Sequence, residues 1–468
     1  MSVEPAIRPS DVPETDILAC DALVVGGGPA GVAAAVELAA AGLAVVLCEQ
    51  GGQAGGALHR RPHGAAAAKG AARAVARQWR RLSAALAAST VALRTRHVFL
   101  GIDADGLALM EDRAAGRLVV AKPSAVVLAV GAVEKVRPRP GWQLPGVGTA
   151  GSLQVMMKET GRAPAGRILV AGNGPLTLAL AAQLARRGNA PVAVIESGDP
   201  LRGALKGIGL AAHPGRALEA AGYMARLLLS GVPWRRGAAV TAIVRRDDAL
   251  VATVTRADGR TEHIEADRIA LHDGIRPNAF GLAATRLAGE RPYVVHAGDC
   301  REALGNRAAE ADGRLAARRV LAALRGDAAA VAAAEKSIAR ERRLQALLGE
   351  LFAPVSSAAS LAGLPDETVL CRCEGGTVGA LRALLGGPDA PSPRELRLNG
   401  RFAMGACQGR FCADWVSEAT AALAPGRDPF PTEDLTGRRW PLRPVAIASV
   451  VGPCAGASPD NDAQRGTS

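Results

Sequence analysis

Residues 21–49 read DALVVGGGPAGVAAAVELAAAGLAVVLCE, and this stretch decides the fold class. The apolar run at 22–25 predicts a short, buried parallel strand. Glycines with G-x-G-x-x-G spacing follow it directly, residues 30–41 have the composition of a helix, and a second apolar run occupies 44–47. Strand, glycine-rich turn, helix and strand in this order are typical of a Rossmann-type dinucleotide-binding unit, so we predict an α/β fold.

The glycines of this turn have separate physical roles. Gly26 permits the tight turn, Gly28 lets the backbone approach a pyrophosphate, and Gly31 allows the helix to pack closely on the strand. The helix N-terminus offers free amides and a partial positive charge to an anion. Glu49, 23 positions after Gly26, stands where a ribose-binding acid is expected. The predicted dinucleotide contacts of this unit are Gly26, Gly28, Pro29, Ala30, Gly31, Glu49 and Gln50.

Two later segments favour FAD over NAD at this first unit. Residues 126–131 (VVLAVG) form an apolar strand that ends in glycine, and residues 296–299 (HAGD) precede a helix-like run. In flavoproteins with two dinucleotide-binding domains, such as the glutathione reductase type, a strand ending in Ala-Thr-Gly and a late Gly-Asp close over FAD. Here Val130 replaces the threonine, and a glycine pair at 55–56 stands where such proteins place backbone near the cofactor. These segments add Gly55, Gly56, Gly131, Gly298 and Asp299 to the predicted FAD contacts.

A second loop repeats the pattern less completely. Residues 167–196 read RILVAGNGPLTLALAAQLARRGNAPVAVIE, with strand, turn, helix and terminal acid in the same order. Thr177 stands at the third glycine position, which predicts looser packing of helix on strand. The predicted contacts are Gly172, Gly174 and Glu196, and the occupant is left open between NAD(P), another adenine nucleotide and no ligand at all. We therefore predict two nested Rossmann-type domains, the second inserted between the halves of the first.

Four cysteines near the C-terminus form two tight pairs. The pairs have C-x-C and C-x4-C spacing, and 33 residues separate them. Thiolates are soft ligands, so the quartet suits zinc or an iron–sulfur cluster. Zinc modules favour C-x2–4-C in both halves, so the C-x-C half, in a chain with a dinucleotide fold, favours the cluster. The predicted metal ligands are Cys371, Cys373, Cys407 and Cys412.

The other cysteines and histidines suggest no catalytic chemistry. We expect the four isolated cysteines to be small buried residues without a chemical role; they are Cys20, Cys48, Cys300 and Cys454. No cysteine pair lies beside either glycine-rich loop, which argues against the disulfide reductases, because those enzymes need a redox pair next to the flavin. His272 and Asp273 fall in a stretch that lies near the flavin in such folds, and we expect a surface-loop role for them. We predict no catalytic residue in this chain.

Composition and charge exclude other classes of protein. The 468 residues suffice for two or three domains, and 49% hydrophobic and 21% charged residues are ordinary for a globular protein. The formal charge of +12 comes from scattered arginines and aromatics make up 3%, so nucleic-acid binding is not indicated. The first twenty residues lack the apolar run of a secretory signal, and no uncharged stretch reaches the ~20 residues of a spanning helix. We expect a cytoplasmic protein, with peripheral association at the inner face of the cell membrane left open.

Several longer phrases resemble one set of flavoproteins. They are GWQLPGVGTAG at 141–151 with Gln154, the second loop, CRCE at 371–374, MGACQGRFC at 404–412 and GRRWPLR at 437–443. Over residues 20–450 the chain resembles the α-type subunits of opine oxidases, hydroxyproline dehydrogenases and hydrogen cyanide synthase. The part from residue 367 is similar to the [2Fe–2S] domain of bacterioferritin-associated ferredoxin, with C-x4-C in place of C-x2-C.

The resemblance implies a division of labour between subunits. A β-type flavin oxidase subunit would oxidise a C–N bond, and its electrons would pass to the FAD and [2Fe–2S] cluster of the α-type chain and on to a quinone-linked or other acceptor. The chain would then be the electron-transfer subunit of a heteromeric amine or amino-acid dehydrogenase, of opine oxidase, D-hydroxyproline dehydrogenase or hydrogen cyanide synthase type. Two alternatives stay open: a self-sufficient NAD(P)H-dependent FAD/iron–sulfur reductase, and a metal-dependent regulatory or assembly protein with a relic nucleotide fold.

Motifs and resemblance together predict six segments. They are an N-terminal extension (1–20), a discontinuous FAD-binding domain (21–150 and 270–325), a second nucleotide-binding domain (151–269), a helix and linker (326–366), a [2Fe–2S] domain (367–440) and a C-terminal tail (441–468). Within the [2Fe–2S] domain, Thr377 is expected to cap a helix that runs to Leu385.

Overall fold

The computed structural model describes residues 17–62, 73–202, 209–210, 212–285, 291–326, 332–355, 361–387, 389, 391–424, 426–437 and 440–451. Several sequence predictions fall wholly or partly outside these ranges. They are the N-terminal extension up to residue 16, the linker at 356–360, the C-terminal tail from 452 and Cys454 within that tail.

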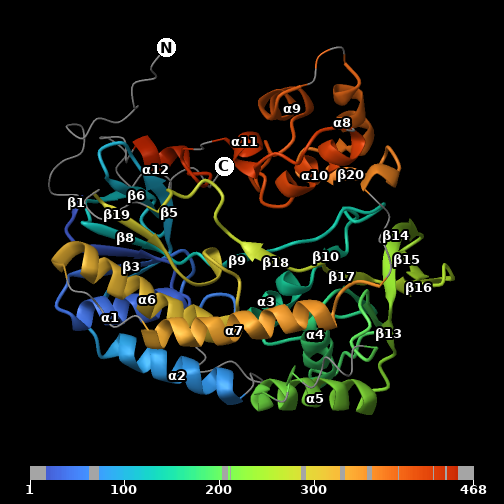
Figure 1. The fold of residues 1–468 in the computed structure, drawn as a ribbon, viewed down its shortest axis with the longest axis horizontal. Helices are drawn as coiled ribbons and strands as arrows, with labels where there is room; N and C mark the ends of the chain where they lie inside the picture. Colours follow the sequence, from blue (N-terminus) through green and yellow to red (C-terminus); the bar gives the residue numbers. More distant parts are fainter. Residues whose placement is uncertain are drawn as a thin grey trace, which may run out of the picture.

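The first of two parallel five-stranded sheets has the strand order β19-β8-β2-β3-β4. Its strands are β2 (Ala22–Val25), β3 (Val45–Glu49), β4 (Ala92–Thr95), β8 (Ala125–Leu128) and β19 (Tyr293–His296). The strand predicted at 22–25 is β2, and its parallel neighbours confirm the predicted α/β class. Because β19 comes from far along the chain, two separated parts of the sequence build this sheet (Figure 1).

Side chains of β2 alternate between two cores. Ala22 and Val24 face helices α1 (Pro29–Ala40) and α6 (Asn306–Arg325), whereas Leu23 and Val25 face a second, smaller sheet. That sheet has the order β1-β7-β6-β5, with bounds Ile17–Leu18, Arg117–Ala121, Ala108–Asp112 and His97–Ile102. A continuous apolar run with no polar alternation is what burial on both faces requires.

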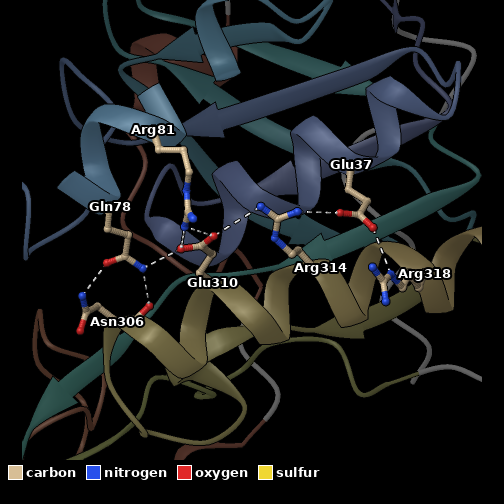
Figure 2. Close-up of polar contacts among 7 residues, drawn as sticks. All are labelled: Glu37, Gln78, Arg81, Asn306, Glu310, Arg314 and Arg318. Atoms are coloured by element: carbon tan, nitrogen blue, oxygen red, sulfur yellow. Dashed lines mark hydrogen bonds and ion pairs between the residues drawn. The ribbon is translucent and has the colours of Figure 1, made fainter. Parts of the chain in front are cut away.

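Ion pairs join the three helices that cover the first sheet, α1, α6 and α2 (Arg73–Ala87). Figure 2 shows Glu310 of α6, which is 8% exposed, accepting hydrogen bonds from Gln78 and Arg81 of α2. Arg314 of α6 reaches both Glu310 and Glu37 of α1. The two carboxylates therefore tie α1 and α2 to α6 and stiffen the layer on which the first glycine-rich loop rests.

The second parallel sheet has the order β10-β17-β11-β12-β13. Its strands are β10 (Val147–Thr149), β11 (Ile168–Gly172), β12 (Ala193–Glu196), β13 (Trp234–Arg236) and β17 (Arg268–His272). Helices α3 (Ala150–Thr160), α4 (Pro175–Arg186) and α5 (Pro214–Leu229) cover one face. The antiparallel strands β14 (Ala238–Arg246), β15 (Ala249–Arg256) and β16 (Thr261–Ala266) cover the other.

A two-stranded antiparallel ribbon joins the two parallel sheets. Its strand β9 (Ala132–Glu134) follows β8 of the first sheet, and β18 (Ile275–Pro277) follows β17 of the second. The N–H of Asn278 donates to the carbonyl of Gly131 at 3.1 Å, which fixes one end of the ribbon to the first sheet. In Figure 1 the ribbon lies between the sheets, and α7 (Ala332–Leu351) runs from α6 toward the second sheet.

The cysteine-bearing residues 361–437, called here the cysteine module, have a core of their own. The module contains η5 (Leu361–Gly363), β20 (Val369–Cys371), β21 (Gly376–Thr377), α8 (Val378–Leu385), α9 (Pro393–Gly400), α10 (Ala413–Leu423) and α11 (Thr432–Thr436). The predicted cap of α8 is confirmed, because the Thr377 side chain accepts the N–H of Ala380 at 3.2 Å. After the module, α12 (Ile447–Val451) returns to the first sheet region (Figure 1). Among the described residues, no helix combines the length and apolar character that crossing a membrane requires.

Candidate functional site

The N-terminus of α1 is left open by the first glycine-rich loop. No side chain caps it, its first turn carries no acid, and Gly28 is its N-cap residue. A Cβ on Gly28 would meet only the Cα of Gly56, 3.9 Å away, whereas a Cβ on Gly31 would lie 1.8 Å from the carbonyl oxygen of Gly26. Gly31 therefore serves close packing, and Gly28 borders a space through which an anion can reach the helix amides.

Glu49 is held at the end of β3 by two backbone amides. Its carboxylate accepts the N–H of Gly27 at 2.7 Å and the N–H of Gly51 at 2.6 Å, and the residue is 6% exposed. Each oxygen keeps a further lone pair, so the carboxylate can still accept a ribose hydroxyl. Gln50, the next predicted contact, is exposed. No role was predicted for Gly27 from the sequence, although its place in a run of three glycines could have indicated one.

The other residues predicted for FAD gather around the same helix N-terminus. The N–H of Gly55 donates to the carbonyl of Gly27 at 2.8 Å, and Gly56 lies against Gly28. A Cβ on Gly298 would meet the Cβ of Ala30, which follows Pro29 at the start of α1. Asp299 accepts the N–H of Gly305 at 2.9 Å, and burial raises the pKa of its carboxyl. Gly131, two residues after the Ala129 that contacts Gly26, completes the predicted set.

The second loop folds its acid inward. Glu196 is fully buried and accepts the N–H groups of Gly174 and Gly198. Thr177, at the third glycine position, donates its hydroxyl to the carbonyl of Gly174 at 2.7 Å and lies 3.3 Å from a Glu196 oxygen. Burial raises the pKa of Glu196 to about 8, so the carboxyl is largely protonated at neutral pH. At Gly172, a Cβ would lie 1.7 Å from the carbonyl oxygen of His272 on the neighbouring strand.

The chain's own segment 352–355 lies on this second loop. Asn173 donates its side-chain amide to the carbonyl of Phe352 at 2.5 Å, and Val355 donates its N–H to Ser197 at 3.0 Å. Pro354 forms an isolated bridge with Gly198, where a Cβ would lie 2.6 Å from the carbonyl oxygen of Phe352. The segment therefore covers the carboxyl ends of β11 and β12, the edge at which parallel α/β sheets bind ligands. In the sequence, these residues fall within the predicted helix and linker (326–366), with no sign of this contact.

The cysteine module brings all four predicted sulfur ligands into one series of contacts. The Sγ atoms of Cys412 and Cys371 are 3.7 Å apart, and both residues are buried. Cys412 also hydrogen-bonds to Cys407, which in turn contacts the exposed Cys373. In the described ranges, no group of three or more His, Cys, Asp or Glu side chains is arranged to hold a metal ion as it stands. None of the seven described cysteines forms a disulfide.

Backbone amides surround these sulfurs. Glu374 and Ala403 donate to Cys371, and the hydrogen bond from Cys412 lowers the pKa of Cys371 to about 6. Hydrogen bonding from Cys412 likewise lowers the pKa of Cys407 to about 5, with amide donors that follow it in the loop. Gly405 is required beside the exposed sulfur, because a Cβ there would lie 2.1 Å from the Cβ of Cys373. Cys371 and Cys407 thus favour the thiolate, which is the metal-binding form of cysteine, whereas burial raises the pKa of Cys373 and hydrogen bonding to Cys371 and Cys407 raises the pKa of Cys412.

Aromatic and cationic side chains fasten the cysteine module to the sheets. Trp142, from the phrase at 141–151, is 1% exposed and donates its indole N–H to the carbonyl of Val369 at 2.6 Å. Arg372 lies over the same indole, 5.1 Å from the ring centre. On the ribbon side, Lys135 lies 4.4 Å from the ring centre of Trp415 in α10. The sequence marked Trp142 only by resemblance; its partner is 227 residues away.

His272 and Asp273 brace the ribbon. His272 is the last residue of β17, is buried, and places its Nδ1 2.8 Å from a carboxylate oxygen of Glu134 in β9. Asp273 accepts the N–H of Arg137 at 2.7 Å and pairs with the guanidinium of Arg139. The predicted surface-loop role is therefore wrong for His272, because β17 continues to that residue and its polar partner comes from the neighbouring ribbon.

The sequence profile of the pyridine nucleotide-disulphide oxidoreductases matches residues 20–303, the part of the chain that forms both parallel sheets. The chain belongs to this family. The predicted α/β fold with Rossmann-type parallel sheets and the predicted flavin-dependent oxidoreductase class are confirmed by this membership, which implies FAD as the cofactor.

Named relatives place the chain within the family more closely. The A subunit of opine oxidase from Agrobacterium tumefaciens (strain Ach5) is 33% identical, over 92% of this chain and 91% of the relative. The HcnB subunit of hydrogen cyanide synthase from Pseudomonas aeruginosa (strain PAO1) is 30% identical, over 85% of this chain and 91% of the relative. The L-proline dehydrogenase of P. horikoshii shares the fold, with a TM-score of 0.62 and 17% identity over 93% of this chain and 80% of that one. The predicted resemblance to opine oxidase and hydrogen cyanide synthase subunits is thereby confirmed.

Proposed function

We propose that this chain is the FAD- and [2Fe–2S]-containing electron-transfer subunit of a heteromeric amine or amino-acid dehydrogenase. The observation that carries the proposal is the series of contacts among Cys371, Cys412, Cys407 and Cys373, in a module that is fastened to the ribbon leaving the first sheet. A flavin at the first loop and a metal centre in the module would then be held in one folded body.

The first loop suits FAD. The open α1 N-terminus, the space beside Gly28 and the fixed carboxylate of Glu49 match a pyrophosphate and a ribose in that order along the loop. Gly131 comes three residues after β8 and Asp299 three residues after β19, so both follow the carboxyl ends of neighbouring strands in the first sheet. FAD, when bound, supplies a carrier that takes up electrons in pairs and releases them singly.

The cysteine module suits a [2Fe–2S] cluster better than a single zinc ion. A two-iron cluster needs two thiolates on each iron, and the series of four contacting sulfurs can supply them. The C-x-C spacing of the first pair also differs from the C-x2–4-C spacing that zinc modules favour. Amides aimed at sulfur from Glu374, Ala403 and the Cys407–Cys412 loop are the contacts that tune a cluster. The ligands are Cys371, Cys373, Cys407 and Cys412, of which Cys373 is exposed and stands nearest to an external redox partner.

A partner protein carries the substrate chemistry in this account. Oxidation of a CH–NH bond to C=N releases two electrons and two protons, and we assign that step to a β-type flavin oxidase subunit. The relatives are named as subunits of opine oxidase and hydrogen cyanide synthase, which supports an amine or amino-acid donor and a hetero-oligomer. The electrons would leave this chain for a quinone-linked or other acceptor.

Co-expression with the oxidase-like partner tests the proposal. We expect dye reduction with opine, hydroxyproline, glycine or a related amine only when both proteins are present, and flavin in each of them. Each protein tested by itself is the control. Amine oxidation at the full rate by this chain without its partner would contradict the proposed division of roles between the two subunits.

The NAD(P)H-dependent reductase is the competing assignment. It requires a nicotinamide dinucleotide at the second loop, and the segment 352–355 on Asn173 and Gly198 occupies that edge. Glu196, unlike Glu49, is 0% exposed and has the Thr177 hydroxyl beside it, so its carboxyl presents no surface to a ribose. We therefore expect no bleaching of the flavin when the purified chain is mixed anaerobically with NADH or NADPH, and rapid bleaching would favour the reductase.

A further inference from the structure

We infer that Arg276 is a positioning residue that holds the Cys407–Cys412 loop against the ribbon and raises the reduction potential of the iron–sulfur centre. The inference rests on the proposed function, since it needs a cluster at the four cysteines. Arg276 belongs to neither glycine-rich loop nor to the cysteine module, and no motif assigned it a role.

Arg276 lies in the ribbon that is hydrogen-bonded to the predicted flavin region and also contacts the cysteine module. It lies in β18, opposite Val133 of β9, so it is one strand away from the residues that leave the first sheet. Asn278, two residues later, donates its N–H to Gly131, the predicted FAD contact. The backbone of the ribbon is therefore anchored beside the predicted flavin contact Gly131, and the Arg276 side chain extends from the ribbon to the cysteine module.

The guanidinium of Arg276 makes directional contacts with both sides of the cysteine loop. Its Nη1 donates to the Asp414 carboxylate of α10 at 2.9 Å, and its Nη2 donates to the carbonyl of Arg410, within the loop itself. Its flat face lies 4.1 Å from the ring centre of Phe280. The planar guanidinium of arginine can make these contacts at once, whereas the ammonium of lysine is a point charge.

The contacted loop is the part of the module that departs from the ferredoxin pattern. Its C-x4-C spacing has two more residues than C-x2-C, and Gln408 within it has a φ of +54°, in the left-handed region. Arg410 donates its own guanidinium to the carbonyl of Cys407 at 3.1 Å. A longer loop with an unfavourable backbone angle needs external support, and Arg276 supplies it from the ribbon.

The position of the charge also matters for electron transfer. The Arg276 side chain is 16% exposed, and its charge interacts with Cys412 and Cys407 as well as with Asp414. A [2Fe–2S] cluster gains one electron on reduction, with no bond broken, so a nearby, partly buried cation stabilises the reduced state more than the oxidised state. Without Arg276, the Asp414 carboxylate would stay beside the loop and act in the opposite direction.

A redox titration of the full-length holoprotein, followed by electron paramagnetic resonance, tests the inference. We expect Arg276→Gln to keep iron and sulfide content but to shift the midpoint potential of the cluster to more negative values. Arg276→Lys, which keeps the charge and loses the planar fork, should recover most of the shift. Arg382→Gln is the matched control, because Arg382 pairs with Asp366 on the surface of the same module. It should keep the wild-type potential.

Two outcomes would overturn the inference. One is an Arg276→Gln protein with a full cluster and the wild-type potential. The other concerns Asp414→Asn, which is measured if Arg276→Gln loses the cluster. Asp414→Asn removes the opposing charge and should shift the midpoint potential to more positive values. No shift or a negative shift would refute the role of Arg276. A wild-type chain without any iron–sulfur signal would instead reject the proposed function, so the two failures are distinguishable.

Discussion

Gly28 and Gly31 belong to one turn but meet different surroundings. A methyl group on Gly28 would point into open space, whereas one on Gly31 would collide with the Gly26 carbonyl. We expect Gly28→Ala to change the free energy of unfolding by less than about 0.5 kcal/mol and to weaken FAD binding. The methyl group would stand where the pyrophosphate approaches and cost about 1–3 kcal/mol, or roughly ten- to a hundredfold in affinity.

Gly31→Ala is the contrasting variant. It should lower the free energy of unfolding by about 2 kcal/mol or more, because the helix must move away from the strand. Thermal unfolding and flavin content of both purified variants check the pair. A Gly28→Ala protein that keeps full flavin affinity would show that the pyrophosphate lies elsewhere.

The raised pKa of the buried Glu196 leads us to expect that the free energy of unfolding depends on pH. Its folded pKa of about 8 lies above the ordinary value of 4.5 because of burial, so the folded state binds a proton that the unfolded chain releases. The stability it contributes is fully present below about pH 4.5 and is lost as the pH rises toward about 8. Relative to Glu196→Gln, which does not titrate, the wild type should lose about 2–3 kcal/mol between pH 5 and pH 7.

Denaturant unfolding across this pH range measures the effect. The exposed carboxylate of Glu265, in the same unit, offers the control Glu265→Gln, which should keep the wild-type pH profile. A constant difference between the wild type and Glu196→Gln would show that Glu196 is ionised in the folded state.

Among the elements, the turn before α3 connects the cysteine module to the second sheet through Trp142. Its indole N–H and the Val369 carbonyl form a partly buried hydrogen bond two residues before the first cysteine ligand. Trp142→Phe keeps most of the ring and removes the donor, so we expect a loss of about 1–3 kcal/mol, because the carbonyl is left without its partner. Amide hydrogen exchange should rise at residues 369–371.

Trp234→Phe is the matched control for Trp142→Phe. The Trp234 indole nitrogen is buried and makes no hydrogen bond among the described residues, so its removal should cost little. Equal effects of the two substitutions would mean that the Trp142 hydrogen bond does not fasten the module.

Local elements could be predicted from the sequence where a short-range signal exists. Strand β2 has its predicted bounds, and α8 has its predicted cap at Thr377 and its predicted end at Leu385. Hydrophobic runs and capping residues act within a few positions, so the local sequence pattern predicts the elements that they define. The segment at 352–355 falls within the predicted helix and linker (326–366), and no local pattern indicates its hydrogen bonds to Asn173 and Ser197, far earlier in the chain.

At the scale of the whole molecule, the sequence predicted the parts but not how they meet. Two glycine-rich loops and four cysteines specify the two parallel sheets and the predicted metal ligands, since each motif is local. The contacts of Arg276 with Arg410 and Asp414 join residues 134 and 138 positions apart, and no periodic pattern encodes them. The coupling between the flavin region and the cysteine module therefore required the folded structure.

The account depends on iron held by the four module cysteines in the same chain as FAD. Analysis of iron, acid-labile sulfide and flavin in the anaerobically purified chain, with electron paramagnetic resonance after reduction, tests this most directly. We predict about two irons and two sulfides per FAD, and loss of the iron signal in Cys371→Ser and Cys407→Ser but not in Cys48→Ser. Zinc in place of iron, or an iron centre that survives replacement of Cys371 or Cys407, would contradict the account.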